Sequence, residues 1–133
     1  MTRRLRWTET ELRANDAETY VVWQLARMIV LGALRENATI IFVKKTSPTK
    51  LAIFFAVDGV LLEQMTPPVE VHMALASQMM LLCGPLQIRT GTRGEFELIR
   101  DDGGLLVAHA VCGDNEWGLT VTIRLAPPPR VLN

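Results

Sequence analysis

The sequence predicts an α+β fold in one domain. Two helical patterns are each followed by three short apolar runs, so the expected order is α-βββ-α-βββ, an antiparallel sheet with helices packed on it. The chain has 133 residues, 49% of them hydrophobic, which is the length and apolar content of one domain with a sizeable core. We expect this domain at residues 15–126, after a basic arm at residues 1–14 that is helical or disordered and before a Pro-rich tail at residues 127–133.

The composition narrows the classes of partner. Lysine plus arginine and aspartate plus glutamate number 14 each, so the formal net charge is zero and no global field attracts nucleic acid or an anionic membrane. A neutral chain also lacks charge repulsion between copies, which leaves a homo-oligomer or a permanent protein partner open. Cys83 and Cys112 supply neither a disulfide framework nor zinc-ligand spacing, and we expect reduced thiols in a cytoplasmic protein. The longest apolar run, Met28 to Leu34, is too short for membrane insertion.

The first helix is predicted from about residue 16 to Arg35 by apolar residues at helical spacing. Asn15 and Glu18 stand three apart, as in a capping box, and Asn37 is the expected stop. Trp23 lies near the apolar face of this helix, and we interpret it as a packing residue.

Three strands are predicted next, at residues 38–45, 50–57 and 60–65, because these runs are rich in Ile, Val, Phe and Leu. Asp58-Gly59 separates the last two and is a strong hairpin signal, since a type I′ turn needs positive φ at both central residues. The three runs therefore predict an antiparallel meander.

The second helix is predicted from Thr66 as N-cap and Pro67 as the first helical residue, through Leu82 to a stop at Gly84. His72 is expected on its surface. Methionines on this helix fill the core or form an adaptable binding surface. Strands at residues 92–100, 105–112 and 118–125 follow, joined by turns at residues 101–104 and 113–115.

No motif for catalysis, cofactor or metal binding is found in the sequence. The phosphate-binding Gly-x-x-x-x-Gly-Lys motif is absent, and Gly91 and Gly94 are expected in a loop before a strand. A Cys-His-Asp site could be drawn from Cys112, His109 and Asp114. His109 and Cys112 are three apart on one strand and therefore point to opposite faces, which argues against a nucleophilic pair.

Two charged patterns are interpreted as solvated surface. Glu95 and Glu97 lie on one face of a strand at a spacing of two, which is typical of an exposed edge. The basic run at residues 3–7 contains Trp7, a combination of cations and an aromatic ring that is typical of nucleic-acid-binding arms. Glu9 and Glu11 follow at once and favour a solubilising leader.

The order of segments from about residue 17 to 126 resembles the PAS-like domain that precedes the motor domain in type II secretion and type IV pilus assembly ATPases. The hairpin Phe-Ala-Val-Asp-Gly-Val-Leu at residues 55–61 is close to the Arg-Ile-Asp-Gly-x-Leu hairpin of that family. Further similarity lies in residues 36–42, in Leu-Cys-Gly at residues 82–84 and in Ile-Arg-Leu at residues 123–125.

In that family the domain packs on the motor domain and directs basic side chains toward bound nucleotide. The resemblance implies Arg89, Arg93 and Arg124 as phosphate-contact candidates, while Glu95 and His109 occupy two family arginine positions. A carboxylate repels phosphate, so the resemblance implies a domain that has lost this chemistry.

The first hypothesis is therefore a non-catalytic interaction or adaptor domain, whose partner is a protein such as a secretion or pilus component. An alternative is a PAS-like domain that senses a small molecule or nucleotide in a pocket lined by methionines. A third is a relative of type III secretion chaperones, which share the order helix, three strands, helix, three strands.

Overall fold

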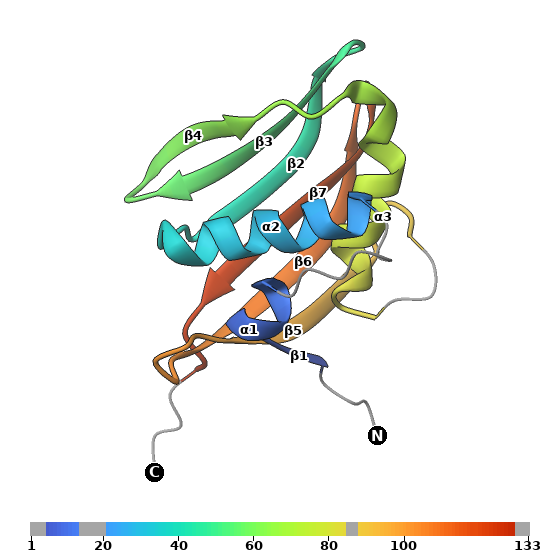
Figure 1. Cartoon of the computed structure of the whole chain (residues 1–133). Coiled ribbons are helices and arrows are strands. Elements are labelled where there is room, and N and C mark those ends of the chain that lie inside the picture. The colour runs from blue at the N-terminus through green and yellow to red at the C-terminus, as the bar shows by residue number, and fades with distance from the viewer. Residues whose placement is uncertain (1–4, 14–20, 85–87, 130–133) are drawn as a thin grey trace.

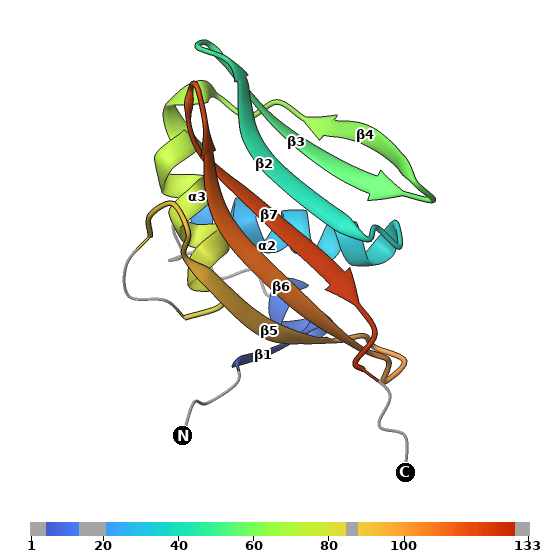
Figure 2. The ribbon, with the colours of Figure 1, turned by 180° about the vertical axis from the view of Figure 1, so that it is seen from behind.

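The computed structural model describes residues 5–13, 21–84 and 88–129, and these residues form an α+β fold. Within them, seven strands form one sheet in the order β1-β5-β6-β7-β2-β3-β4. Neighbouring strands are antiparallel except β1 and β5, which are parallel. The described helices cover one face of the sheet and leave its other face open, as Figures 1 and 2 show from opposite sides. We call that open side the outer face.

The elements lie in the following order along the chain: β1 (Leu5–Thr8), α1 (Glu9–Arg13), α2 (Val21–Arg35), β2 (Ile40–Ser47), β3 (Lys50–Val57), β4 (Val60–Met65), a 3-10 turn η1 (Val69–Val71), α3 (His72–Leu81), β5 (Arg93–Ile99), β6 (Leu105–Asn115) and β7 (Gly118–Ala126). The two predicted groups of three strands are present as meanders, and β2 and β7 join them into one sheet. The α+β prediction is confirmed at this level.

The end of α2 agrees with the prediction. Asn37 has a φ of 55°, the left-handed conformation that ends many helices. The guanidinium of Arg100 donates hydrogen bonds to the Leu34 carbonyl at 3.0 Å and to Asn37 Oδ1 at 3.2 Å, so the last turn is satisfied by a side chain from the turn after β5. The capping box predicted at Asn15 and Glu18 lies outside the described residues.

The hairpin between β3 and β4 also agrees, since Asp58 and Gly59 have φ values of 51° and 77°. One turn was misplaced. β6 continues to Asn115, so the predicted turn at residues 113–115 is strand, and the chain reverses at Glu116 and Trp117.

The start of the second helix was predicted wrongly. Thr66, Pro67 and Pro68 lie ahead of η1 in no regular structure, and α3 begins at His72 without a side-chain cap. The physical reason is Pro68, because a proline disfavours helical dihedrals in the residue before it, here Pro67. The predicted stop is correct, since Gly84 follows α3 with a φ of 79°.

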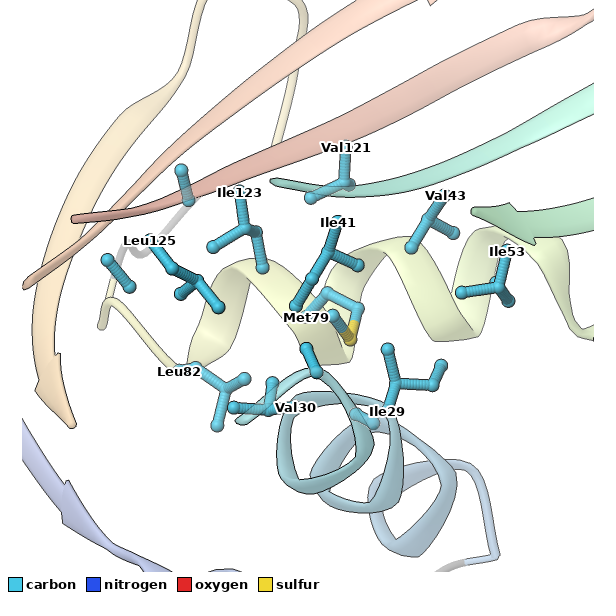
Figure 3. Packing of buried hydrophobic residues seen from close by; sticks show 14 of the residues in the cluster. Ile29, Val30, Ile41, Val43, Ile53, Met79, Leu82, Val121, Ile123 and Leu125 are labelled. Atoms are coloured by element: carbon cyan, nitrogen blue, oxygen red, sulfur yellow. The ribbon is translucent and has the colours of Figure 1, made fainter. Parts of the chain in front are cut away.

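The core lies between the helices and the inner face of the sheet. Figure 3 shows Ile29 and Val30 of α2 opposite Ile41 and Ile123 of the sheet, with Met79 of α3 between the two layers. Met79 and Met80 are fully buried, so two methionines of α3 fill the core. Met73, on the same helix, is 55% exposed.

Leu5 to Arg13 pack on the domain, so the fold extends beyond the boundary predicted at residue 15. The helix expected as one option for this arm is present as α1, whereas the strand β1 was not predicted. Trp7 donates a hydrogen bond from Nε1 to the Leu82 carbonyl at 3.1 Å, and its ring meets that of Trp23 edge-on at 5.7 Å. Trp23 is thus a packing residue, as predicted.

Two further residues differ from prediction. His72 is buried at 5% exposure, not on the helix surface, because its ring reaches the backbone of β7. Gly94 lies inside β5, not in a loop. A Cβ at Gly94 would lie 2.4 Å from the Cβ of Cys83, so the end of the α3 segment packs directly on this glycine.

Candidate functional site

The outer face of the sheet brings together charged residues from three consecutive strands. Glu95 of β5 pairs with His109 of β6, which pairs with Arg124 of β7, and Arg124 pairs with Ile40 of β2. Paired residues share a face, so these four side chains form one row across the sheet. Figure 2 shows the four strands side by side with no helix in front of them.

A second row lies two residues along the strands. Arg93 pairs with Val111, which pairs with Thr122, and Thr122 pairs with Phe42. Two shallow depressions cover both rows. One of about 340 Å³ is lined by Arg93, Gly94, Glu95, His109, Ala110 and Val111. The other, of about 310 Å³, is lined by Ile40, Arg93, His109, Val111, Thr122 and Arg124.

Arg93, His109 and Arg124, which we call the cationic cluster, have one carboxylate beside them, that of Glu95. Glu95 Oε2 lies 3.2 Å from His109 Nδ1, across directly paired positions of β5 and β6. This contact is an ion pair whenever His109 is protonated. The negative charge of Glu95 is then directed at His109, and the two arginines remain the outward-facing charges of the cluster.

Arg93 and Arg124 are exposed, and in the described part of the chain neither forms an ion pair. Arg93 projects from β5 and Arg124 from β7. These two strands are separated by β6, so their backbones lie about 10 Å apart. Each guanidinium can form a bidentate bond with a carboxylate or a phosphate. The cluster can therefore contact two acidic groups spaced along one ligand.

An aromatic patch adjoins the cluster on the same face. Lys44 Nζ lies 5.7 Å from the centre of the Phe42 ring and 5.4 Å from that of Phe54. Phe42 and Phe54 are directly paired across β2 and β3, and both remain partly exposed. The outer face thus presents a charged half over β5, β6 and β7 and an aromatic half over β2 and β3.

The phosphate-contact candidates are separated by the fold. Arg93 and Arg124 lie in the cationic cluster together with Glu95 and His109, the residues at family arginine positions. Arg89 does not line either depression. It precedes β5 in a turn in which its backbone N–H donates to Thr92 Oγ1 at 3.2 Å.

The possible nucleophilic site is not assembled. Cys112 is fully buried on the inner face, whereas His109 lies on the outer face, as their spacing predicts. Burial and the nearby charge of Asp114 raise the pKa of the Cys112 thiol. Among the described residues no three His, Cys, Asp or Glu side chains gather in a way that could hold a metal ion.

The interpretation of Glu97 as part of a solvated edge was wrong. This residue is only 8% exposed, and its Oε1 lies 3.1 Å from Arg6 Nη2 of β1. No local pattern in the sequence indicates this contact, because β1 covers Glu97 only through a long-range parallel pairing. Glu97 therefore holds the N-terminal strand through Arg6, and Glu95 is the carboxylate that lies beside the cationic cluster.

Comparison with protein-family models and with curated protein sequences finds no match for this chain. The described residues form an α+β protein with a single sheet that is open on one face. Within the described ranges, the helices are all too short or too polar to cross a membrane.

Proposed function

We propose that this chain is a non-catalytic protein-interaction domain, an adaptor resembling the PAS-like accessory domain of secretion and pilus assembly ATPases. In this proposal the outer face receives an acidic segment of a protein partner. The observation that carries it is the position of Arg93 and Arg124, two exposed cations beside a partly exposed aromatic patch.

Charge and shape favour a polypeptide over a small ligand. The depressions are shallow and lie on a sheet, whereas small-molecule sites are usually concave and bury most of the ligand. An extended segment can place acidic side chains on Arg93 and Arg124 and apolar ones on Phe42 and Phe54. Glu95, which lines the same depression as Arg93, repels the several negative charges of a nucleotide's phosphates more strongly than the single charge of one carboxylate.

Peptide selection tests this proposal. Peptides enriched from a random displayed library by the wild-type chain should carry Asp or Glu next to aromatic or aliphatic residues. Arg93→Glu and Arg124→Glu should each weaken binding of a selected peptide about tenfold or more, and added salt should weaken it further. Arg35→Glu, which reverses an exposed cation at the end of α2, is the matched control and should bind as wild type.

The same variants apply in cells. A protein that co-purifies from native cells with the wild type and with Arg35→Glu, but not with Arg124→Glu, would be the expected partner. Enrichment of peptides without acidic residues, or equal binding by Arg124→Glu, would refute the role of the outer face.

A small-molecule sensor is the second candidate, because the cationic depression of about 340 Å³ is large enough for part of such a ligand. Met79 and Met80, expected to line its pocket, are buried in the core and line neither depression. A thermal-shift screen with nucleotides and metabolites separates the two, since a ligand at 100 times its Kd stabilises by about 2.7 kcal/mol. Preferential binding of long unfolded segments would instead favour the chaperone alternative.

A further inference from the structure

The two edge strands of the sheet, β1 and β4, differ in length and in exposure. β1 has four residues, carries Arg6 and passes directly into α1. β4 has six residues, all of them exposed, including Val60, Leu61, Leu62 and Met65 at 38–55%. Proteins usually protect edge strands by keeping them short, charged or covered, because an open edge is a template for pairing. Among the described residues, β1 is short and passes into a helix, whereas β4 is longer, mostly apolar apart from Glu63 and Gln64, and its edge is not covered by another element.

The backbone of β4 is oriented for pairing at Leu61. Leu61 lies opposite Ala56, whose carbonyl accepts a hydrogen bond from Thr39 N at 2.8 Å and so points toward β2. Leu61 therefore lies in a non-hydrogen-bonded pair with Ala56, because the groups of an antiparallel strand alternate in direction. Its own N–H and C=O point away from β3, to the open edge.

We propose that β4 pairs antiparallel with β4 of a second copy, about a two-fold axis perpendicular to the sheet at Leu61. Such an axis keeps the outer faces of both copies on one side of the combined sheet. Two residues that pair must therefore lie on the same face, so both are odd-numbered or both are even-numbered. The pair of Leu61 with its own copy is then hydrogen-bonded in both directions.

Side-chain chemistry selects this register. With Leu61 opposite Leu61, Val60 lies opposite Leu62 of the other copy, and Glu63 lies opposite Gly59. A shift by two residues along the pair would bring Leu62 to the axis and place each Leu61 opposite Glu63, and a shift by two more would place two Glu63 carboxylates face to face. Cross-strand apolar pairs stabilise a sheet and like charges destabilise it, so the Leu61 register is preferred.

A second copy suits this edge better than an unrelated strand. The partner must present apolar side chains on both faces, and β4 does so, with Leu61 on the outer face and Leu62 on the helix side. The charge of Glu63 is already paired with Lys50 Nζ at 3.0 Å, and the chain carries no net charge.

Because the β1 edge is protected, pairing ends at two copies. A six-residue edge buries less than the roughly 1,200 Å² of a standard interface, so we expect a dissociation constant on the order of micromolar.

Sedimentation of the full chain over a range of concentrations tests the proposal. The wild-type mass should rise with concentration from 14.9 kDa toward twice that value. Leu61→Lys and Leu61→Glu should each remain monomeric, because each places like charges opposite one another at the axis. An equimolar mixture of the two should recover association, since a lysine then faces a glutamate. Met73→Lys, at an equally exposed apolar residue of α3, should associate like wild type.

Each other outcome overturns the proposal. A wild type that stays monomeric up to about 1 mM has no such edge pairing. Unchanged association of Leu61→Lys would place the contact elsewhere, and stronger association would indicate the register in which residue 61 faces Glu63. Circular dichroism confirms that each variant is folded. Peptide binding on the outer face is measured through Arg93 and Arg124, so failure of either proposal is seen separately.

Discussion

The imidazole Nε2 of His72 lies 2.7 Å from the carbonyl oxygen of Leu119 and ties the first turn of α3 to β7. The carbonyl can only accept, so Nε2 carries the hydrogen. Gly118 lies beside the same ring, since a Cβ there would be 3.1 Å from His72 Cε1. A polar side chain therefore anchors the start of a helix that has no side-chain cap of its own.

Replacing His72 with alanine should lower the free energy of unfolding by about 1–3 kcal/mol, because it removes a buried side chain together with its part-buried hydrogen bond to Leu119. Met73→Ala, one residue along the same helix but 55% exposed, should change it by less than about 0.5 kcal/mol. Urea denaturation of both variants provides the measurement. Equal effects would mean that the hydrogen bond adds nothing beyond helix propensity.

The N-terminal strand should contribute to stability through Trp7. Trp7→Phe removes the hydrogen bond from Nε1 to Leu82 and should cost about 1 kcal/mol. Trp7→Ala also removes the contact with Trp23 and should cost roughly 2–4 kcal/mol, given that Trp7 is only partly buried. Unfolding followed by far-UV circular dichroism avoids the loss of a fluorophore. If Trp7→Ala unfolds at the wild-type urea concentration, β1 is a leader and not part of the fold.

What the sequence predicted correctly is mostly local. Runs rich in Ile, Val, Phe and Leu and the Asp58-Gly59 pair located β3 and β4 to the residue, because strand propensity and turn chemistry act over a few positions. The strand β1 was missed because its pairing with β5 joins distant parts of the chain. A local signal was available only for the helix that follows β1. Thr8 and Glu11 have the spacing of a capping box, and they exchange capping hydrogen bonds of 3.0 and 3.1 Å at the start of α1.

The site shows the same division. The strand period alone predicts that His109 and Cys112 point to opposite faces, because they are three residues apart on β6. The row of Glu95, His109 and Arg124 depends on the register of three strands and on which sheet face the helices cover, and neither is encoded in a local pattern. The aromatic patch was missed because Phe42 and Phe54 belong to runs that read as buried strands, and only the helix placement reveals their outer orientation.

Two glycine-to-alanine substitutions should have opposite signs. Gly94→Ala places a Cβ 2.4 Å from that of Cys83 and should destabilise by about 1–3 kcal/mol. Gly32→Ala, inside α2, meets only the Phe55 ring at 3.6 Å and should stabilise by about 0.5–1 kcal/mol, because alanine favours the helix. Thermal or urea unfolding measures both.

The clash at Gly94 has its own control. In a Cys83→Gly background, Gly94→Ala should cost less than in the wild type, because the opposing Cβ is gone. Additive effects of the two substitutions would show that the close approach is not the cause.

Alkaline pH should weaken the fold through Cys83. Burial raises the pKa of this thiol from its ordinary value of 9.0 to about 12. Above about pH 9 the unfolded chain loses the thiol proton while the folded chain keeps it, so stability falls as pH rises toward 12 and is unaffected below 9. The loss is less than about 1.4 kcal/mol per pH unit, since Cys83 is partly exposed. Cys83→Ala should lose less stability than wild type between about pH 8 and pH 10, measured by urea unfolding. Parallel pH profiles for the two proteins would show that Cys83 ionises as readily in the folded chain as in the unfolded one.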